Sequence, residues 1–258
     1  MLSAKRLFTL VTAITAGAAC SETTNPLIGT GQSVSLSFAG RAPGASGVLS
    51  AAAAGDSMVI SIGGNTLILN SVDLVLRKIE LKRQGVTANC DSVVVERDCE
   101  EFTLGEMLVH VPLAAGTVTA FTVPIDSGTY TGAEFKIHKP GTDSMDLAFK
   151  AANPTWPANV SIRVTGRYNG TPFTYTTSLD VEQETTFSPP LVVDASGSAT
   201  NLTLRADVSL WFKTAGGALI DPATANVGQP NESTVNNSIK NSFKSFKDAD
   251  HDGNEGNG

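Results

Sequence analysis

The alternation of apolar and polar residues with a period of two limits the fold of this chain more than any other feature. From Ser33 to Lys213, segments such as "SVSLSF" and "SMVISI" place an apolar residue at every second position. In an extended strand, successive side chains point to opposite faces of the sheet, so one row enters a core and the other meets solvent. The alternation therefore predicts β-strands with one buried face.

The segment from residue 65 to 83 changes the phase of its alternation partway along. In "NTLILNSVDLVLRKIELKR", Leu74 and Leu76 share one phase, and Ile79 and Leu81 share the other. A β-bulge adds one residue to a strand and shifts the phase of the side chains that follow. The sequence therefore predicts a bulge between Leu76 and Ile79.

Further short strands are predicted along the chain, separated by turn residues. Asn169 and Gly170 divide two alternating runs in "NVSIRVTGRYNGTPFTYTTSLDVEQ", which indicates a hairpin with a two-residue turn. The other predicted strands are "EMLVHVPL" at 106–113, "TVTAFTVPI" at 117–125, "AEFKIHK" at 133–139, "DLAFKAA" at 146–152 and "NLTLRADVSLWF" at 201–212.

About ten or eleven strands with no long helical pattern between them predict an all-β fold, an antiparallel β-sandwich over residues 33–225. Hydrophobic residues make up 41% of the chain, which is enough for a packed core. We expect one domain, because no linker rich in proline and serine divides the run, although residues 150–159 are the best candidate for a boundary. The net charge of -7 offers no basic surface for a polyanion, so we expect no nucleic acid partner.

The N-terminus has the pattern of a secretory signal. "MLSAKRLFTLVTAITAGAAC" places two basic residues before an apolar run from Leu7 to Ile14, and small residues follow up to Cys20. The run is shorter than the roughly 20 apolar residues of a membrane span. "AGAAC" resembles the lipobox of bacterial lipoproteins, with Gly17 where an aliphatic residue is usual. We therefore expect a lipoprotein signal peptide at 1–19 and a lipid on Cys20; the alternative is an ordinary signal peptide cleaved near Ala19.

Residues 20–32, "CSETTNPLIGTGQ", form a polar, turn-rich stretch that suits a flexible tether between a lipid and a domain. The lipid would make the membrane a partner of the chain. Ser21 follows Cys20, and resemblance to lipoproteins without an acidic residue at this position implies retention in the outer membrane.

Cys90 and Cys99 flank eight residues, "DSVVVERD". Export to an oxidising compartment allows a disulfide between them, and a short hairpin or loop would bring them together. A metal site is the alternative, but the spacing is not CxxC and no histidine is near in the sequence. We therefore predict a disulfide.

Three segments resemble parts of an uncharacterised family of bacterial envelope lipoproteins. They are "DCEEF" at 98–102, "PIDSGTYTGAEFKIHKP" at 124–140 and "LTLRADVSLWF" at 202–212. That family is described as a domain of unknown function with a β-sandwich related to transthyretin-like or carboxypeptidase-regulatory-like modules. The resemblance implies a fold and a location in the cell envelope, and it implies no catalytic residue.

The sequence contains no GxSxG, HExxH or GxxxxGK[ST] motif. His110, His138 and His251 lie far apart in the chain, and we assign none of them a role. The leading hypothesis is therefore a non-catalytic envelope lipoprotein with a structural or binding role. The alternatives are a glycan- or protein-binding adhesin module and an exported hydrolase with an unrecognised site.

Trp156 is the candidate ligand contact of the adhesin hypothesis. It lies in "NPTWPAN", between two prolines, where a loop side chain can project into solvent and stack on a sugar or a protein. The alternative is a loop tryptophan that covers the end of the sandwich core.

Residues 231–247 predict a C-terminal helix. Val235, Ile239, Phe243 and Phe246 recur at spacings of four, four and three, which defines one helix face that would dock on the sandwich.

The acidic tail at 248–258, "DADHDGNEGNG", begins like a calcium loop. Asp248, Asp250 and Asp252 match loop positions 1, 3 and 5, Gly253 matches the sharp turn at position 6, and Asn254 at position 7 can donate a carbonyl. The glutamate of position 12 would fall one residue beyond the last residue of the sequence. Two interpretations stay open: a solvated acidic tail, and a weak calcium site of roughly millimolar affinity.

Overall fold

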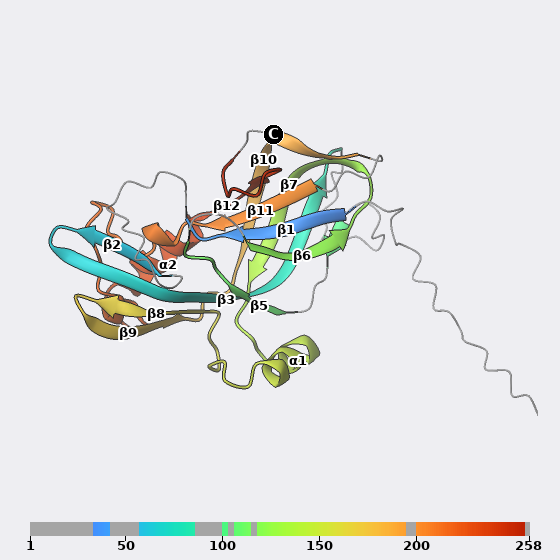
Figure 1. The fold of residues 1–258 in the computed structure, drawn as a ribbon. Helices are drawn as coiled ribbons and strands as arrows, with labels where there is room; N and C mark the ends of the chain where they lie inside the picture. Colours follow the sequence, from blue (N-terminus) through green and yellow to red (C-terminus); the bar gives the residue numbers. More distant parts are fainter. Residues whose placement is uncertain are drawn as a thin grey trace, which may run out of the picture.

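The computed structural model describes residues 33–41, 57–85, 100–102, 106–114, 118–194 and 200–255. Within these ranges the chain forms two β-sheets and two α-helices (Figure 1), which confirms the predicted all-β sandwich. The elements are β1 Ser33–Ala39, β2 Met58–Ile62, β3 Asn65–Arg83, β4 Glu100–Phe102, β5 Met107–His110, β6 Val118–Pro124, β7 Gly128–Ile137, α1 Ser144–Ala152, β8 Ile162–Tyr168, β9 Thr171–Thr177, β10 Val181–Val193, β11 Thr200–Ala206, α2 Glu232–Lys240 and β12 Phe243–Lys247.

The smaller sheet has the strand order β12-β11-β1-β6, and the larger has the order β10-β7-β3-β8-β9, with β2, β4 and β5 also paired to β3. The described pairs are antiparallel except β1 and β11, which run parallel. Apolar side chains of both sheets form one buried cluster, including Leu36 of β1, Leu204 of β11, Leu74 of β3 and Tyr175 of β9. This cluster contains residues from both sides of the 150–159 segment, which therefore does not separate two cores.

The phase change in β3 is a bulge, as predicted. The register between β3 and β7 shifts between Leu76 and Ile79, and both side chains belong to the same buried cluster. The two residues between them, Arg77 and Lys78, therefore face away from that core. A bulge changes the face of the sheet to which the following side chains point. The side chain of Arg77 therefore lies on the outer face of the larger sheet.

The predicted hairpin turn is also confirmed. Strands β8 and β9 pair up to Tyr168 and Thr171, and the two residues between them both have positive φ, 50° for Asn169 and 83° for Gly170. This backbone matches the twist of the flanking strands. The Asn169 side chain also accepts a hydrogen bond from the backbone N–H of Thr66 at 2.8 Å, which fixes the turn to β3.

The strand predicted at 146–152 is wrong, because these residues belong to α1. Asp143 caps the helix by accepting from the Asp146 N–H, and the Asp146 side chain accepts from the Asp143 N–H in return. This capping box supplies partners to backbone donors that a helix otherwise leaves free. Phe149 of α1 packs with Val75 in a second, smaller cluster on the outer face of β3.

The predicted helix at 231–247 is correct only as far as Lys240. Val235 and Ile239 are fully buried on α2, but Phe243 and Phe246 lie on β12, which pairs antiparallel with β11. Sheet formation here satisfies backbone groups along one side of β11 that a continuing helix would leave without partners. The ring of Phe243 then reaches the core, with its centroid 5.3 Å from that of Phe135.

Candidate metal centres

Several predicted features lie outside the described residues. These are the signal peptide at 1–19, the lipidation site Cys20, the tether at 20–32 and the disulfide between Cys90 and Cys99. In the part of the chain that the structure describes, no helix has the length and hydropathy needed to cross a membrane.

Trp156 is buried rather than projecting from its loop. The residue is 9% exposed, and its indole N–H donates to the carbonyl oxygen of Val160 at 2.7 Å. The ring of Phe149 lies edge-on to it, and the guanidinium of Arg163 lies 4.7 Å from its centroid. The indole therefore does not project into solvent as the adhesin hypothesis expects, because it fills the space between α1 and the sheet.

The acidic tail starts directly after β12, so a strand rather than a helix leads into it. Carboxylate oxygens of Asp248, Asp250 and Asp252 lie within 4.8 Å of one another. Asp248 is buried, at 2% exposure, whereas Asp250 and Asp252 are exposed. Three of the four predicted metal-ligating residues are thus brought together at the edge of the smaller sheet.

Hydrogen bonds hold Asp248 in a tight loop. Its Oδ1 accepts from the N–H of Asp252 at 3.1 Å, and its Oδ2 accepts from the N–H of Gly253 at 3.0 Å and from the hydroxyl of Thr203 on β11 at 2.7 Å. His251 and Gly253 have positive φ, 58° and 79°. The loop therefore folds back on its first aspartate and turns at the glycine that a calcium loop places at position 6.

Asn254 contacts Asp252 twice. Its backbone N–H donates to Oδ1 of Asp252 at 2.7 Å, and its side-chain amide donates to Oδ2. Its own side-chain oxygen is buried without a hydrogen-bond partner among the described residues. Asn254 thus positions Asp252.

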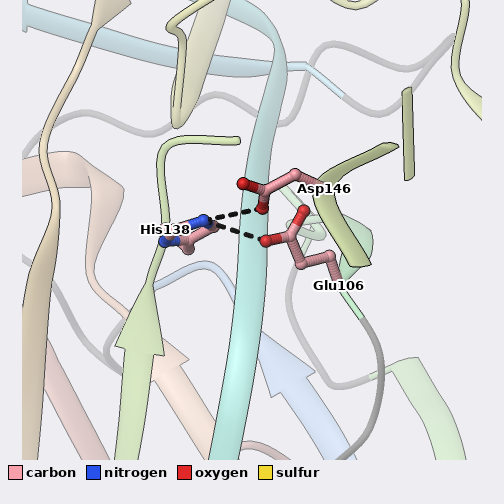
Figure 2. A group of neighbouring side chains, drawn as sticks. All are labelled: Glu106, His138 and Asp146. Atoms are coloured by element: carbon pink, nitrogen blue, oxygen red, sulfur yellow. Dashed lines mark hydrogen bonds and ion pairs between the residues drawn. The ribbon is translucent and has the colours of Figure 1, made fainter. Parts of the chain in front are cut away.

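A second group of potential ligands lies beneath α1 (Figure 2). It consists of Glu106, His138 and Asp146, whose ligand atoms also lie within 4.8 Å of one another. We call it the α1 cluster. The side chains of its members are 0%, 9% and 3% exposed, respectively.

The strand register explains why Glu106 and His138 meet. Leu76 of β3 pairs with Met107 of β5 and with Ile137 of β7. Continuing the β3–β5 register by one residue places Glu106 opposite Arg77. Continuing the β3–β7 register by one residue places His138 opposite Val75, and the His138 N–H donates to the Val75 carbonyl at 3.0 Å. Since Val75 faces away from the main core, Glu106 and His138 share its face of the sheet. The first turn of α1 then adds Asp146 from above.

The imidazole Nε2 of His138 is the centre of this group. It lies 2.9 Å from Oε1 of Glu106 and 3.0 Å from Oδ1 of Asp146 (Figure 2). The guanidinium Nη1 of Arg77 lies 3.1 Å from the same nitrogen. Arg77 also pairs with Asp143 at 2.7 Å. The α1 cluster therefore joins two carboxylates, one imidazole and one guanidinium.

The two carboxyl groups of the α1 cluster have opposite pKa shifts. Burial and the adjacent Asp146 raise the pKa of Glu106 to about 8, although Arg77 opposes this. Burial also disfavours the charged form of Asp146. Hydrogen bonds with Glu106, His138 and the N–H of Gly141 outweigh this effect of burial, and they lower the pKa of Asp146 to about 2. At neutral pH one buried acid is thus charged and the other protonated, since two neighbouring carboxylates resist joint ionisation.

No spacing signal in the sequence predicts the α1 cluster, and His138 is the histidine to which sequence analysis assigns no role. Glu106 precedes β5 and lies 32 residues before His138, which follows β7, and Asp146 lies eight residues further on in α1. One usable signal is Asp143 three residues before Asp146, an N-cap pattern that places Asp146 in the first turn of a helix.

No family model, curated protein or solved structure matches this chain. The resemblance to envelope lipoproteins therefore stays a prediction.

Proposed function

We propose that this chain is an exported, lipid-anchored protein of the bacterial cell envelope, held in the outer membrane, with a structural or binding role instead of a catalytic one. The observation that carries the proposal is the leader, in which two basic residues, an apolar run and small residues precede Cys20. The described sandwich begins at Ser33, so residues 20–32 would serve as the tether between lipid and domain. Its partners would be the membrane and an envelope protein or glycan.

Metabolic labelling tests the anchor. Cells that produce the wild-type chain are fed an alkyne fatty acid and compared with cells that produce Cys20→Ala, with Cys90→Ser as the matched control for loss of a cysteine. We expect label on the wild type and on Cys90→Ser and none on Cys20→Ala. Equal labelling of all three would contradict the proposal.

The binding role includes calcium at the C-terminal loop. Asp248, Asp250 and Asp252 place three carboxylates around one point, and these are the hard oxygen ligands that calcium prefers. Because two of the three are exposed, we expect roughly millimolar affinity. Bound calcium would order the tail against β11, to which Asp248 is already joined through Thr203.

Calorimetry tests the calcium site on the full chain. Wild type is expected to release or absorb heat on calcium addition, and Asp250→Ala is expected to show none. Glu182→Ala, an exposed acid on β10 that lies outside the loop, removes the same charge and should behave like wild type. The absence of calcium heat in the wild type would identify the tail as a solvated acidic segment.

Two observations bear on the alternatives. The adhesin hypothesis loses its candidate contact, because Trp156 is buried. For the hydrolase hypothesis, the α1 cluster offers no acid or base group that a substrate can reach, because the side chains of Glu106 and Asp146 are 0% and 3% exposed. A broad substrate screen of the exported chain in which a hydrolytic activity is lost in Asp146→Asn would favour the hydrolase instead.

A further inference from the structure

The carboxylate of Glu106 is buried without the hydrogen bonds that such a group normally requires. Its side chain is 0% exposed, and neither oxygen accepts a hydrogen bond within the described residues. Its neighbours are Nε2 of His138 at 2.9 Å, Nη1 of Arg77 at 3.4 Å and the carboxylate of Asp146, to which a protonated Glu106 donates. Buried polar groups are nearly always satisfied, and an unsatisfied one calls for an explanation such as an ion. In Figure 2 the carboxylate of Glu106 points toward His138 and Asp146, so its unused acceptor positions face the other two members of the α1 cluster.

The spacing of the potential ligand atoms suits a first-row metal ion. The Nε2 atom of His138 lies 2.9 Å from the Glu106 oxygen and 3.0 Å from the Asp146 oxygen. Metal bonds of about 2.1 Å separate neighbouring ligand atoms by about 3.0 Å in an octahedral site and by about 3.4 Å in a tetrahedral one, so small shifts of these side chains suffice for either geometry. Two carboxylates and one imidazole are ligands that zinc and manganese accept.

Groups around the cluster support two of the three ligands from outside. The second carboxylate oxygen of Asp146, Oδ2, accepts from the N–H groups of Gly141 at 2.6 Å and Asp143 at 3.4 Å, which leaves Oδ1 facing His138. The Nδ1 atom of His138 lies 3.4 Å from a carboxylate oxygen of Asp180. A metal-bound imidazole typically directs its other nitrogen to a carboxylate in this way.

Arg77 now occupies the position that a cation would take. Its Nη1 lies 3.1 Å from His138 Nε2, 3.4 Å from Glu106 Oε1 and 3.6 Å from Asp146 Oδ1. The same guanidinium is tied to Asp143, which is 46% exposed, by Nη2 at 2.7 Å. Arg77 can therefore withdraw toward solvent while keeping this ion pair.

The geometry points to a binding site for a divalent first-row transition-metal ion, with Glu106, His138 and Asp146 as ligands and Arg77 as the cation that the metal replaces. Glu106 gives up its proton to solvent when the ion binds. The ion joins α1 to strands β5 and β7 across the outer face of the larger sheet. This site is separate from the acidic tail and does not depend on the lipid anchor.

Zinc titration of the full chain tests the site. The chain is stripped with a chelator, dialysed and titrated with zinc by calorimetry against a competing chelator. We expect one equivalent to bind through the cluster, with affinity at least about tenfold weaker in Glu106→Gln and His138→Ala. Glutamine has nearly the shape of a protonated glutamate, so Glu106→Gln should keep the fold. Arg77→Met removes the competing guanidinium and is expected to bind zinc several-fold tighter.

Matched controls separate this site from other zinc ligands. His110→Ala removes an exposed histidine, Asp250→Ala disrupts the acidic tail, and a Cys90→Ser, Cys99→Ser double variant removes two cysteines; all three should bind as wild type does. Unchanged zinc affinity in folded Glu106→Gln and His138→Ala would overturn the proposal. If either variant fails to fold, cobalt replaces zinc on the wild type and on the double cysteine variant. Visible bands typical of nitrogen and oxygen ligation support the site, and their absence at millimolar cobalt overturns it.

Discussion

Replacing Asp248 by alanine tests whether this aspartate holds the C-terminal loop to the sandwich even without calcium. Its carboxylate accepts hydrogen bonds from the Thr203 hydroxyl and the Gly253 N–H, which are both buried, and from the N–H of exposed Asp252. Water can replace the carboxylate at the exposed N–H but not readily at the two buried donors. A lost hydrogen bond to a charged group costs about 1.5–3 kcal/mol. Because two such hydrogen bonds are lost, we expect the free energy of unfolding to fall by about 3–6 kcal/mol.

Asp250 provides the matched comparison, because its side chain is exposed and belongs to the same trio. Without calcium, Asp250→Ala should change the free energy of unfolding by less than about 0.5 kcal/mol. With a dissociation constant of about 1 mM, 10 mM calcium should stabilise the wild type by about 1.4 kcal/mol and neither variant.

The assay is urea unfolding in chelator and in 10 mM calcium, followed by the fluorescence of the buried tryptophans Trp156 and Trp211. The reasoning would be refuted if Asp248→Ala cost less than about 1 kcal/mol in chelator. It would also be refuted if Asp250→Ala cost as much as Asp248→Ala, because the hydrogen bonds of Asp248 would then not distinguish the two residues.

Three further predictions concern the sandwich and the α1 cluster. Gly166→Ala would place a Cβ 2.0 Å from the carbonyl oxygen of Ile68, so it should lower the thermal midpoint sharply, whereas Gly216→Ala, whose nearest atom is 3.8 Å away, should not. Trp156→Ala should cost about 3–5 kcal/mol in urea unfolding, because it leaves a cavity; a loss below about 1 kcal/mol would indicate an exposed indole. In chelator, folding raises the pKa of Glu106 from 4.5 to about 8, so the native state holds this proton more tightly than the unfolded chain does. The free energy of unfolding should therefore fall as pH rises from about 4.5 to about 8, and Glu106→Gln should remove this component of the slope.

The parts of the fold that were predictable depend on residues that are neighbours in sequence. The bulge between Leu76 and Ile79 and the turn at Asn169 and Gly170 follow from strand alternation and from turn residues that adopt positive φ. In both cases the local preference agrees with the sheet that surrounds it, so no distant contact is needed to choose the conformation.

Two sequence-based assignments are wrong because of competing signals. Residues 146–152 alternate weakly, but the capping box of Asp143 and Asp146 starts a helix there. Phe243 and Phe246 continue the helical spacing of α2, but pairing with β11 draws them into a strand. Short apolar patterns suit either structure, and the available hydrogen-bond partners decide between them.

The sequence by itself determined the alternating strands, the bulge, the hairpin turn and the order of the three aspartates in the tail, because each depends on residues close together in the chain. Only the tertiary structure decided that Trp156 is buried, that Asp248 is tied to Thr203, and that Glu106, His138 and Asp146 meet beneath α1. The register of β5 and β7 on β3 sets which distant side chains share a face, and the docking of α1 sets what covers them. No local sequence pattern encodes the strand register or the docking of α1.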